Sequence, residues 1–524
     1  MKRKLYQNGT ILTMGHPAQA SSVLVEDGVI RALDADRAGL ADVEIVDLRG
    51  RTMLPAFLDA HSHLSAVANG LLQCSLEDCA DFDAIRRQIS DYIARKKIPA
   101  GQWVLAKGYD HTALREGKHP TLAVLDAAAP EHPLMLQHRS GHVGVVNSLG
   151  LRRLGLTPET PDPSGGKIGR EDGKLTGYLE ENAFLNSQKQ VGGPDPEALF
   201  QAFQEAQQYY LRYGITTVQE GMLPEQLVPV YRELCRRGLL TVDVVGYADA
   251  AAGPQLREAL GDYVGRYRDN FRLGGYKMFL DGSPQGRTAW MRQPYAGEDD
   301  YRGYPTLTDE QVESYLRQGA VDGMQVLAHC NGDAAAQQFL NAVEKLEGEG
   351  LDVAAIRPVL VHGQLLGVDQ LDAVRCTGVL ISFFAAHVYH WGDIHIRNFG
   401  MGRARYLTPA RSALERGIPI TFHQDTPVLP PDMLETIWCA AVRRTREGVQ
   451  MEERIGVQEG LQAVTANTAY QYFEEDSKGT IAPGKRADFV VLDRNPLVVP
   501  PEELRAIRVM ETVRGGETLY RAAE

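Results

Sequence analysis

Six side chains of metal-ligand type stand near the downstream ends of short apolar runs in this 524-residue chain. They are His61, His63, Lys277, His329, His362 and Asp425. Residues i and i+2 of a strand point to the same side, so His61 and His63 can present two imidazoles to one cation. Such a cation lowers the pKa of bound water to about 7, which supplies hydroxide near neutrality. The set predicts a centre for one or two divalent ions, with zinc as the default for histidine-rich ligands.

Each of these residues also has an ordinary structural explanation. An isolated histidine is often a packed core residue, Lys277 can pair with Asp281, and Asp425 can cap a turn. The repeated placement at strand ends favours the metal interpretation. Burial would lower the pKa of Lys277, and a neutral amine can take up CO2 to form a carbamate that bridges two ions. Asp425 is the predicted general base and acid.

Eight strand-like runs are expected to position these residues. They cover residues 52–60, 214–220, 239–248, 275–281, 324–329, 357–362, 378–386 and 418–424. Helix-like segments such as DEQVESYLRQGA and TPARSALERG separate the later runs, which is typical of parallel α/β folds. The pattern predicts a (β/α)8 TIM-type barrel, in which the loops after the strands form the active-site face.

Two further parts surround the predicted barrel, which spans residues 53–475. Residues 66–205 are far too long for a normal connection, so we expect an inserted cap subdomain after the first strand. Residues 1–52 and 476–524 read as short β-runs broken by turns. Neither end can bury a core alone, so together they predict a composite β-sandwich domain.

Composition excludes several classes of partner. The net charge is −13 without a Lys/Arg-rich stretch, which argues against nucleic acid. No apolar run approaches a membrane span of about 18 residues, and MKRKLYQNGTILTM lacks an apolar h-region, so we expect a soluble cytoplasmic protein. Six cysteines without C-x-x-C pairs indicate reduced thiols. A small-molecule substrate is expected, and a homo-oligomer is neither predicted nor excluded.

The motifs together resemble a known family. NGTILTM, LPAFLDAHSH, KMFLDGSPQGRTA, AHCNGD and GTIAPGKRADFVVLDRNP follow one another along nearly the whole chain. This order resembles the amidohydrolase superfamily, specifically its amidohydrolase 3 branch with N-substituted formamide deformylase-like proteins. The resemblance implies hydrolysis at a metal centre. It implies metal-ligand roles for His61, His63, Lys277, His329 and His362, and a catalytic role for Asp425.

Substrate contacts are harder to assign from the sequence. The branch's G-H-x-x-x-x-N-S element appears as GHVGVVNS, so His142 is a candidate for holding substrate, or else a structural residue of the cap. VHGQ replaces the usual E-H-A-Q, and HQDTP places His423 close to the catalytic position. The segment after the seventh strand predicts a loop with pocket residues His387, Tyr389 and Trp391, unless it is a packed structural loop.

The predicted reaction is metal-dependent hydrolysis of a C–N amide-type bond in a small molecule, such as an amide, a formamide or an N-acyl group. Hydrolysis of an ester or a cyclic amide is the alternative, because the same tetrahedral chemistry serves all three. A catalytically silent homologue that acts as a scaffold or binding protein is the alternative from another class.

Overall fold

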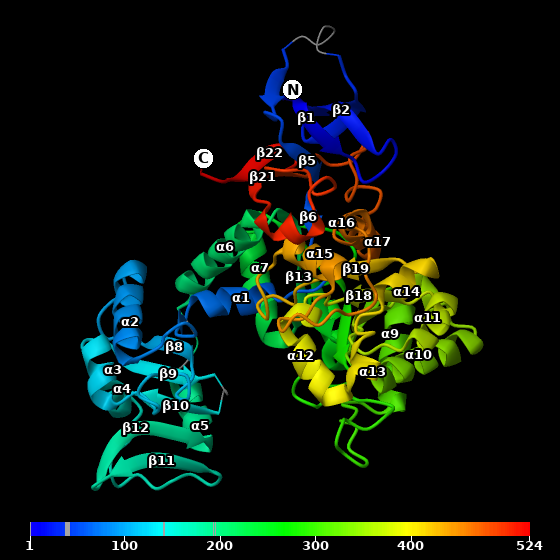
Figure 1. Cartoon of the computed structure of the whole chain (residues 1–524). Helices are drawn as coiled ribbons and strands as arrows, with labels where there is room; N and C mark the ends of the chain where they lie inside the picture. The colour runs from blue at the N-terminus through cyan, green and yellow to red at the C-terminus, as the bar shows by residue number, and fades with distance from the viewer. Residues whose placement is uncertain (1, 37–41, 140–141, 192, 194, 524) are drawn as a thin grey trace. The chain divides into compact units, whose positions relative to one another are not determined.

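The computed structural model describes residues 2–36, 42–139, 142–191, 193 and 195–523 (Figure 1). The chain divides into two compact units. The larger unit contains Met1–Ser65 and Ala206–Glu524, and the insertion unit contains Ala66–Glu205. Among the described residues, no helix combines the length and the apolar character that crossing a membrane requires.

A parallel sheet of eight strands forms the centre of the larger unit, and it confirms the predicted fold class. The strands pair in chain order, with every neighbouring pair parallel. They are β6 (Phe57–Leu58), β13 (Ile215–Leu223), β14 (Asp243–Asp249), β15 (Phe271–Phe279), β16 (Gln325–Cys330), β17 (Val359–His362), β18 (Leu380–Phe383) and β19 (Ile420–Phe422). The sheet curls so that the His63 N–H donates to the Thr426 carbonyl at 2.9 Å, which links the segments after its first and last strands.

The first predicted strand is shared between two sheets. Strand β5 (Thr52–Pro55) pairs with the terminal strands, and β6 joins the barrel. The Ala56 N–H donates to the Asp488 carbonyl at 3.0 Å, whereas the Phe57 N–H donates to the Gly214 carbonyl at 2.9 Å. The chain therefore changes partner between these two residues, a few positions after the expected boundary at residue 53.

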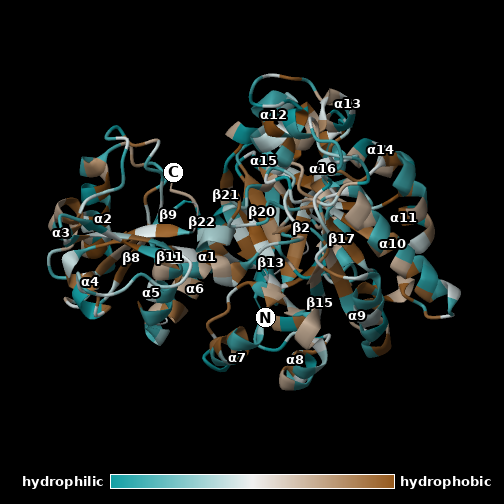
Figure 2. Ribbon diagram, turned by 90° about the horizontal axis from the view of Figure 1, so that it is seen from below, coloured by the Kyte–Doolittle hydropathy of each residue, from teal (hydrophilic) through white to brown (hydrophobic). Residues whose placement is uncertain are grey.

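Helices follow most of the barrel strands, and the apolar side of each helix packs toward the sheet. Helix α9 (Asp309–Asp322) begins with a capping box between Thr308 and Gln311, and it ends at Gly323 in the left-handed conformation. Figure 2 shows the strands of the larger unit largely in hydrophobic colours, with hydrophilic residues on the surrounding helices. The other helices of this unit are α7 (Val228–Arg236), α8 (Gly253–Ala259), α10 (Asp333–Gly348), α11 (Leu371–Thr377), α12 (His387–Phe399), α13 (Met401–Ala404), α14 (Ala410–Glu415), α15 (Met433–Val442), α16 (Val457–Ala463) and α17 (Ala466–Gln471).

Both chain ends contribute strands to a second eight-stranded sheet. It contains β1 (Arg3–Leu12), β2 (Gln19–Glu26), β3 (Val29–Leu33), β4 (Glu44–Asp47), β5, β20 (Phe489–Leu492), β21 (Val509–Arg514) and β22 (Glu517–Arg521). The N-terminal and C-terminal strands lie side by side in Figure 1. Tyr6 and Phe489 meet edge to face at 5.2 Å, within a core drawn from both ends. Neither end buries this core alone.

The insertion unit has its own sheet and its own core. Its strands are β7 (Cys74–Ser75), β8 (Val104–Tyr109), β9 (Leu134–His138), β10 (Val143–Val146), β11 (Gly166–Glu171) and β12 (Lys174–Glu181). Its helices are α2 (Phe82–Lys96), α3 (Leu122–Ala128), α4 (Ser148–Arg153) and α5 (Asn182–Val191), and the junctions with the larger unit fall within α1 (Leu64–Leu71) and α6 (Pro196–Arg212). Strands β7, β8 and β9 are parallel, and the remaining pairs are antiparallel. That this unit caps the barrel mouth stays a prediction.

Candidate metal centre

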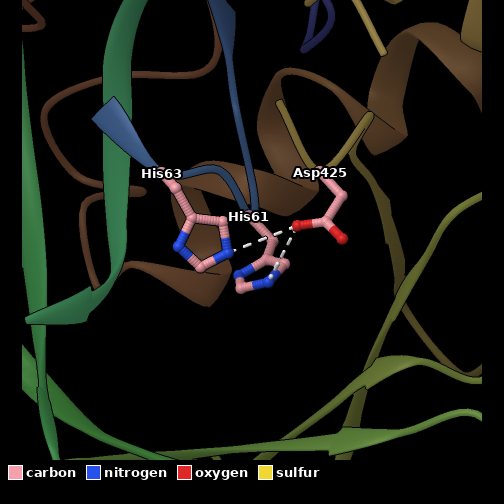
Figure 3. A group of neighbouring side chains, drawn as sticks. All are labelled: His61, His63 and Asp425. Carbon is pink, nitrogen blue, oxygen red and sulfur yellow. Dashed lines mark ion pairs between the residues drawn. The ribbon is translucent and has the colours of Figure 1, made fainter. Parts of the chain in front are cut away.

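Asp425 faces both histidines of the H-x-H motif. Its Oδ1 atom is 3.4 Å from Nε2 of His61 and 3.4 Å from Nε2 of His63 (Figure 3). The three donor atoms lie within 4.8 Å of one another, which is a spacing that one ion can span. The structure therefore brings together residues that are more than 360 positions apart in the sequence.

The other three predicted residues adjoin this group. Nε2 of His362 is 4.0 Å from Oδ2 of Asp425, and Nζ of Lys277 is 3.3 Å from Nε2 of His61. The His329 ring meets the His362 ring edge to face, with 4.6 Å between their centroids. We call these six residues the barrel cluster.

The barrel cluster forms because its members stand at one edge of a parallel sheet. Lys277, His329 and His362 lie in the last residues of β15, β16 and β17, whereas His61 and Asp425 follow β6 and β19. The carboxyl ends of parallel strands meet at the same edge. His362 and Asp425 adopt left-handed backbone conformations, with φ of 79° and 52°. This conformation costs about 1–2 kcal/mol in a non-glycine residue, and such strain is typical of functional sites.

Gln219, on β13, fixes the ring of His61. Its Nε2 donates to the Ala60 carbonyl at 2.9 Å, which accepts only, so its Oε1 faces Nδ1 of His61 at 2.6 Å. That oxygen requires a proton on Nδ1, which leaves the lone pair of Nε2 directed toward Lys277 and Asp425. Gln219 was not among the residues predicted for the site. Its position near the end of the second predicted strand could have indicated that it lies there.

His423 holds His362 in a similar way. Nε2 of His423 is 3.1 Å from Nδ1 of His362, and Nδ1 of His423 is 2.8 Å from the Ser382 hydroxyl. All three side chains are buried, on or next to β17, β18 and β19. This row leaves Nε2 of His362 free to face Asp425.

Asp281 anchors the neighbourhood of His329 and is not the partner of Lys277. Its Oδ1 accepts the Asn331 N–H at 2.9 Å, and its Oδ2 accepts the Gly332 N–H at 2.7 Å. Nδ1 of His329 is 3.2 Å from Asp281, and Nε2 of His329 is 3.2 Å from the Asn331 amide. Nε2 of His329 therefore already faces the Asn331 amide, whereas its buried Nδ1 has no hydrogen-bond partner among the described residues.

Burial shifts the pKa values of several members of the barrel cluster. It lowers the pKa of His61 and of His362 well below the usual value, and it lowers the pKa of Lys277 to about 7. Burial acts to raise the pKa of Asp425, but contact with His63 and the neighbouring His362 and His61 outweigh it and hold that pKa well below its usual range. Neutral imidazoles beside a carboxylate are the forms that bind metal.

The donor set fits a divalent ion. The buried Oδ1 of Asp425 has no hydrogen-bond partner among the described residues. A buried anionic oxygen without a donor is costly, and a cation that the two imidazoles share with it would remove that cost. His61, His63, His362 and Asp425 are therefore the residues best arranged to hold a metal, with Lys277 beside them.

The segment after β18 differs from the expected loop, because residues 387–399 form helix α12. His387 is buried, with its Nδ1 atom 3.0 Å from Nε2 of His395. The Phe384 ring lies 4.6 Å from His387 and 5.4 Å from His423, and so it links the start of this helix to the barrel cluster. Trp391 packs on His387 at 4.5 Å. These residues stay candidates for a substrate pocket.

Tyr389 and His142 have other surroundings. Tyr389 meets Trp438 edge to face at 4.9 Å, and the Arg505 guanidinium lies 5.3 Å from its ring. His142 belongs to the insertion unit, where its 65% exposed side chain lies 3.0 Å from the Glu181 carboxylate. Their predicted contacts with substrate remain predictions.

Comparisons with known proteins indicate the family of this chain. A model of the amidohydrolase family matches residues 44–520. N-substituted formamide deformylase from Arthrobacter pascens is 28% identical, over 96% of this chain and 95% of that protein. YtcJ of Bacillus subtilis, named as a candidate amidohydrolase, is 26% identical over 99% of both chains. An uncharacterized metal-dependent hydrolase from Pyrococcus furiosus superposes with a TM-score of 0.77 at 25% identity, covering 94% of this chain and 100% of that one.

The family match spans residues 44–520, and the structural match covers 94% of the chain. The chain therefore belongs to the amidohydrolase family, as its sequence motifs indicated. It is a metal-dependent hydrolase of the amidohydrolase superfamily.

Proposed function

We propose that the protein hydrolyses a C–N amide-type bond, such as an amide, formamide or N-acyl group, in a small molecule. The observation that carries the proposal is the Oδ1 atom of Asp425, which lies 3.4 Å from Nε2 of both motif histidines and has no hydrogen-bond donor within the described part of the chain. The similarity to N-substituted formamide deformylase supports a C–N bond as the target.

A divalent ion at this centre, zinc by the chemistry of its ligands, would polarise the scissile carbonyl and lower the pKa of the attacking water. The remaining work falls to the chain's own residues. Asp425 accepts the proton that the water loses as its oxygen bonds to the carbonyl carbon. It then donates this proton to the nitrogen as the C–N bond breaks, so that one water is consumed and an amine and an acid are released.

Lys277 serves this site best as a carbamate. Its pKa of about 7 leaves much of the amine neutral at physiological pH, and Asp281, its predicted alternative partner, is held by backbone N–H groups instead. Uptake of CO2 forms an N–C bond and releases one proton, which converts a buried amine into an anionic oxygen ligand. A second divalent ion could then share that ligand with the first.

The first test combines metal analysis with a substrate panel. The barrel cluster of the purified protein should hold about one to two divalent ions per chain, and His61→Ala should lose most of these ions. The loaded enzyme should act on a member of a panel of formamides, N-acyl compounds, lactams and esters in cytoplasm-like buffer. Turnover of esters or lactams alone would move the assignment to the alternative reaction. A metal content that His61→Ala leaves unchanged would contradict the proposed centre.

A further inference from the structure

A second group of metal-ligand side chains lies in the insertion unit. Asp110, His111 and His138 offer one carboxylate oxygen and two imidazole nitrogens, all within 4.8 Å of one another. We call these three residues the insertion cluster. It belongs to a unit with its own core, and none of its members is part of the barrel cluster.

Two parallel strands position the insertion cluster. Strands β8 and β9 pair in parallel, with Tyr109 opposite His138, and each ends at the cluster. Asp110 and His111 directly follow β8, whereas His138 is the last residue of β9. The carboxyl ends of adjacent parallel strands are a common place for ligand sites in α/β sheets.

The distances suit a transition-metal ion. Nδ1 of His111 is 3.2 Å from Nε2 of His138. Two nitrogens bound at 2.0–2.1 Å to a tetrahedral ion would stand about 3.3 Å apart, so this pair already has the required separation. Oδ1 of Asp110 is 3.7 Å from Nε2 of His138, which is too long for a hydrogen bond and within reach of a shared ion.

Neighbouring groups hold the ligands in place. The Thr112 N–H and hydroxyl donate to Oδ1 of Asp110 at 3.0 Å and 2.7 Å, and they fix the carboxylate on the chain that carries His111. The His119 ring stacks on His111 with 4.2 Å between centroids, and Tyr109 hydrogen-bonds to Nδ1 of His119 at 2.9 Å. Such outer contacts orient metal ligands and raise affinity.

The site has an approach from solvent. A pocket of about 690 Å³ in the same unit is lined by His119 and Tyr178, whose rings lie 4.9 Å apart. His119 therefore separates the insertion cluster from an open pocket. The side chain of Asp110 is 20% exposed and that of His138 is 11% exposed, so an ion can enter without unfolding the unit.

We propose that Asp110, His111 and His138 form a second metal site, which binds one Zn²⁺ or a similar divalent transition ion through two imidazoles and one carboxylate. Water or a small ligand fills the coordination positions that the protein leaves open. A divalent ion of this softness fits because the donors are nitrogen and carboxylate oxygen, whereas Ca²⁺ and Mg²⁺ prefer oxygen alone.

Two arrangements compete for the 3.2 Å contact between His111 and His138. Without an ion, one ring nitrogen carries a proton and donates to the other. With an ion, both nitrogens present lone pairs to it. The two arrangements differ in metal binding and not in fold, so a binding experiment separates them.

The test uses the full chain with the barrel cluster disabled. Metal-free His61→Ala/His63→Ala protein is titrated with Co²⁺ alone, and binding is followed by calorimetry and by the visible absorption of the ion. About one ion per chain should bind to the protein. Adding His111→Gln and His138→Gln should abolish this binding, whereas adding His132→Gln, a matched change at a histidine of the same unit outside the insertion cluster, should preserve it.

A milder variant covers the case in which the double substitution fails to fold. Asp110→Asn keeps the shape of the side chain and removes its negative charge. It should weaken Co²⁺ binding by at least about tenfold, which is the usual size of the effect when a group that supports a metal site is changed. Arg139→Gln removes a guanidinium 3.2 Å from Oδ2 of Asp110 and should leave the affinity equal or higher. The proposal is overturned by the absence of Co²⁺ binding in the disabled background, or by an Asp110→Asn affinity equal to that of its parent.

Discussion

The barrel cluster and the insertion cluster use the same residue types at the ends of parallel strands, but their carboxylates differ. In the barrel cluster, Oδ1 of Asp425 faces two imidazoles and has no hydrogen-bond donor in the portion of the chain that the structure describes. In the insertion cluster, Oδ1 of Asp110 already accepts two hydrogen bonds from Thr112. The His61 side chain is 2% exposed, compared with 11% for His138.

This difference separates binding from catalysis. A desolvated carboxylate without donors needs a cation and can accept a proton from water that the cation activates. A carboxylate that already accepts hydrogen bonds from a backbone N–H and a hydroxyl group can bind an ion, but it binds the ion more weakly. It is also a weaker proton acceptor, because these hydrogen bonds stabilise its charged form. We therefore expect the barrel cluster to perform the chemistry and the insertion cluster only to bind.

The largest expected effect tests whether the two units are independent. Deleting residues 479–524 removes β20, β21 and β22 and exposes the apolar faces of β1 and β5. The larger unit should lose its cooperative melting, whereas the insertion unit keeps its own core. Calorimetry of the truncated chain measures both transitions. A soluble truncated protein with unchanged melting would refute the shared terminal sheet.

The next effect concerns Lys277. Lys277→Ala should lower turnover by at least about 100-fold, a loss that acetate or propionate partly restores by supplying the missing oxygen ligand. Full activity of Lys277→Ala without added acid would rule out a carbamate role.

The pH dependence of reactivation provides a second measurement on Lys277. A lysine with a lowered pKa is neutral above that pKa and protonated below it, and only the neutral amine takes up CO2. Reactivation of stripped enzyme by bicarbonate and metal should therefore be slow near pH 6 and level off above about pH 8, because the pKa of Lys277 is about 7. A rate that still climbs at pH 10 would indicate an ordinary lysine.

The smallest effect comes from Gln219. Gln219→Leu removes the acceptor for Nδ1 of His61 and should weaken metal binding by about 10–100-fold. Gln207→Leu is the matched control, because Gln207 is equally buried and hydrogen-bonds to Leu239 and Thr241 instead. It should lower the melting temperature without changing the metal affinity. Equal affinities in the two variants would show that Gln219 does not orient His61.

Much of the fold could be predicted because buried parallel strands are short apolar runs, each followed by a polar residue. All eight barrel strands were found in this way, within a few residues of their observed ends. The division of residues 52–58 between two sheets was not predictable, since apolar residues satisfy either sheet and only the hydrogen-bond partners differ.

The site was predictable where its residues carry unusual chemistry. Histidines and a lysine at strand ends are uncommon enough to be noticed, whereas Gln219 and Ser382 are ordinary polar residues whose role appears only in three dimensions. Helix α12 was expected to be a loop because its aromatic and histidine content hides the helical spacing of its buried residues. Asp110, His111 and His138 were missed because only the pairing of β8 with β9 brings them together.

The central claim is that Asp425 moves the proton in a hydrolysis at the barrel cluster. Asn has nearly the same shape but cannot accept a proton, so Asp425→Asn should keep the fold and most of the metal. Its turnover on the best substrate of the panel, measured with the metal content of the same preparation, should fall by about 10²–10⁴. Turnover near that of the wild type in metal-loaded Asp425→Asn would contradict the account and direct attention to His423.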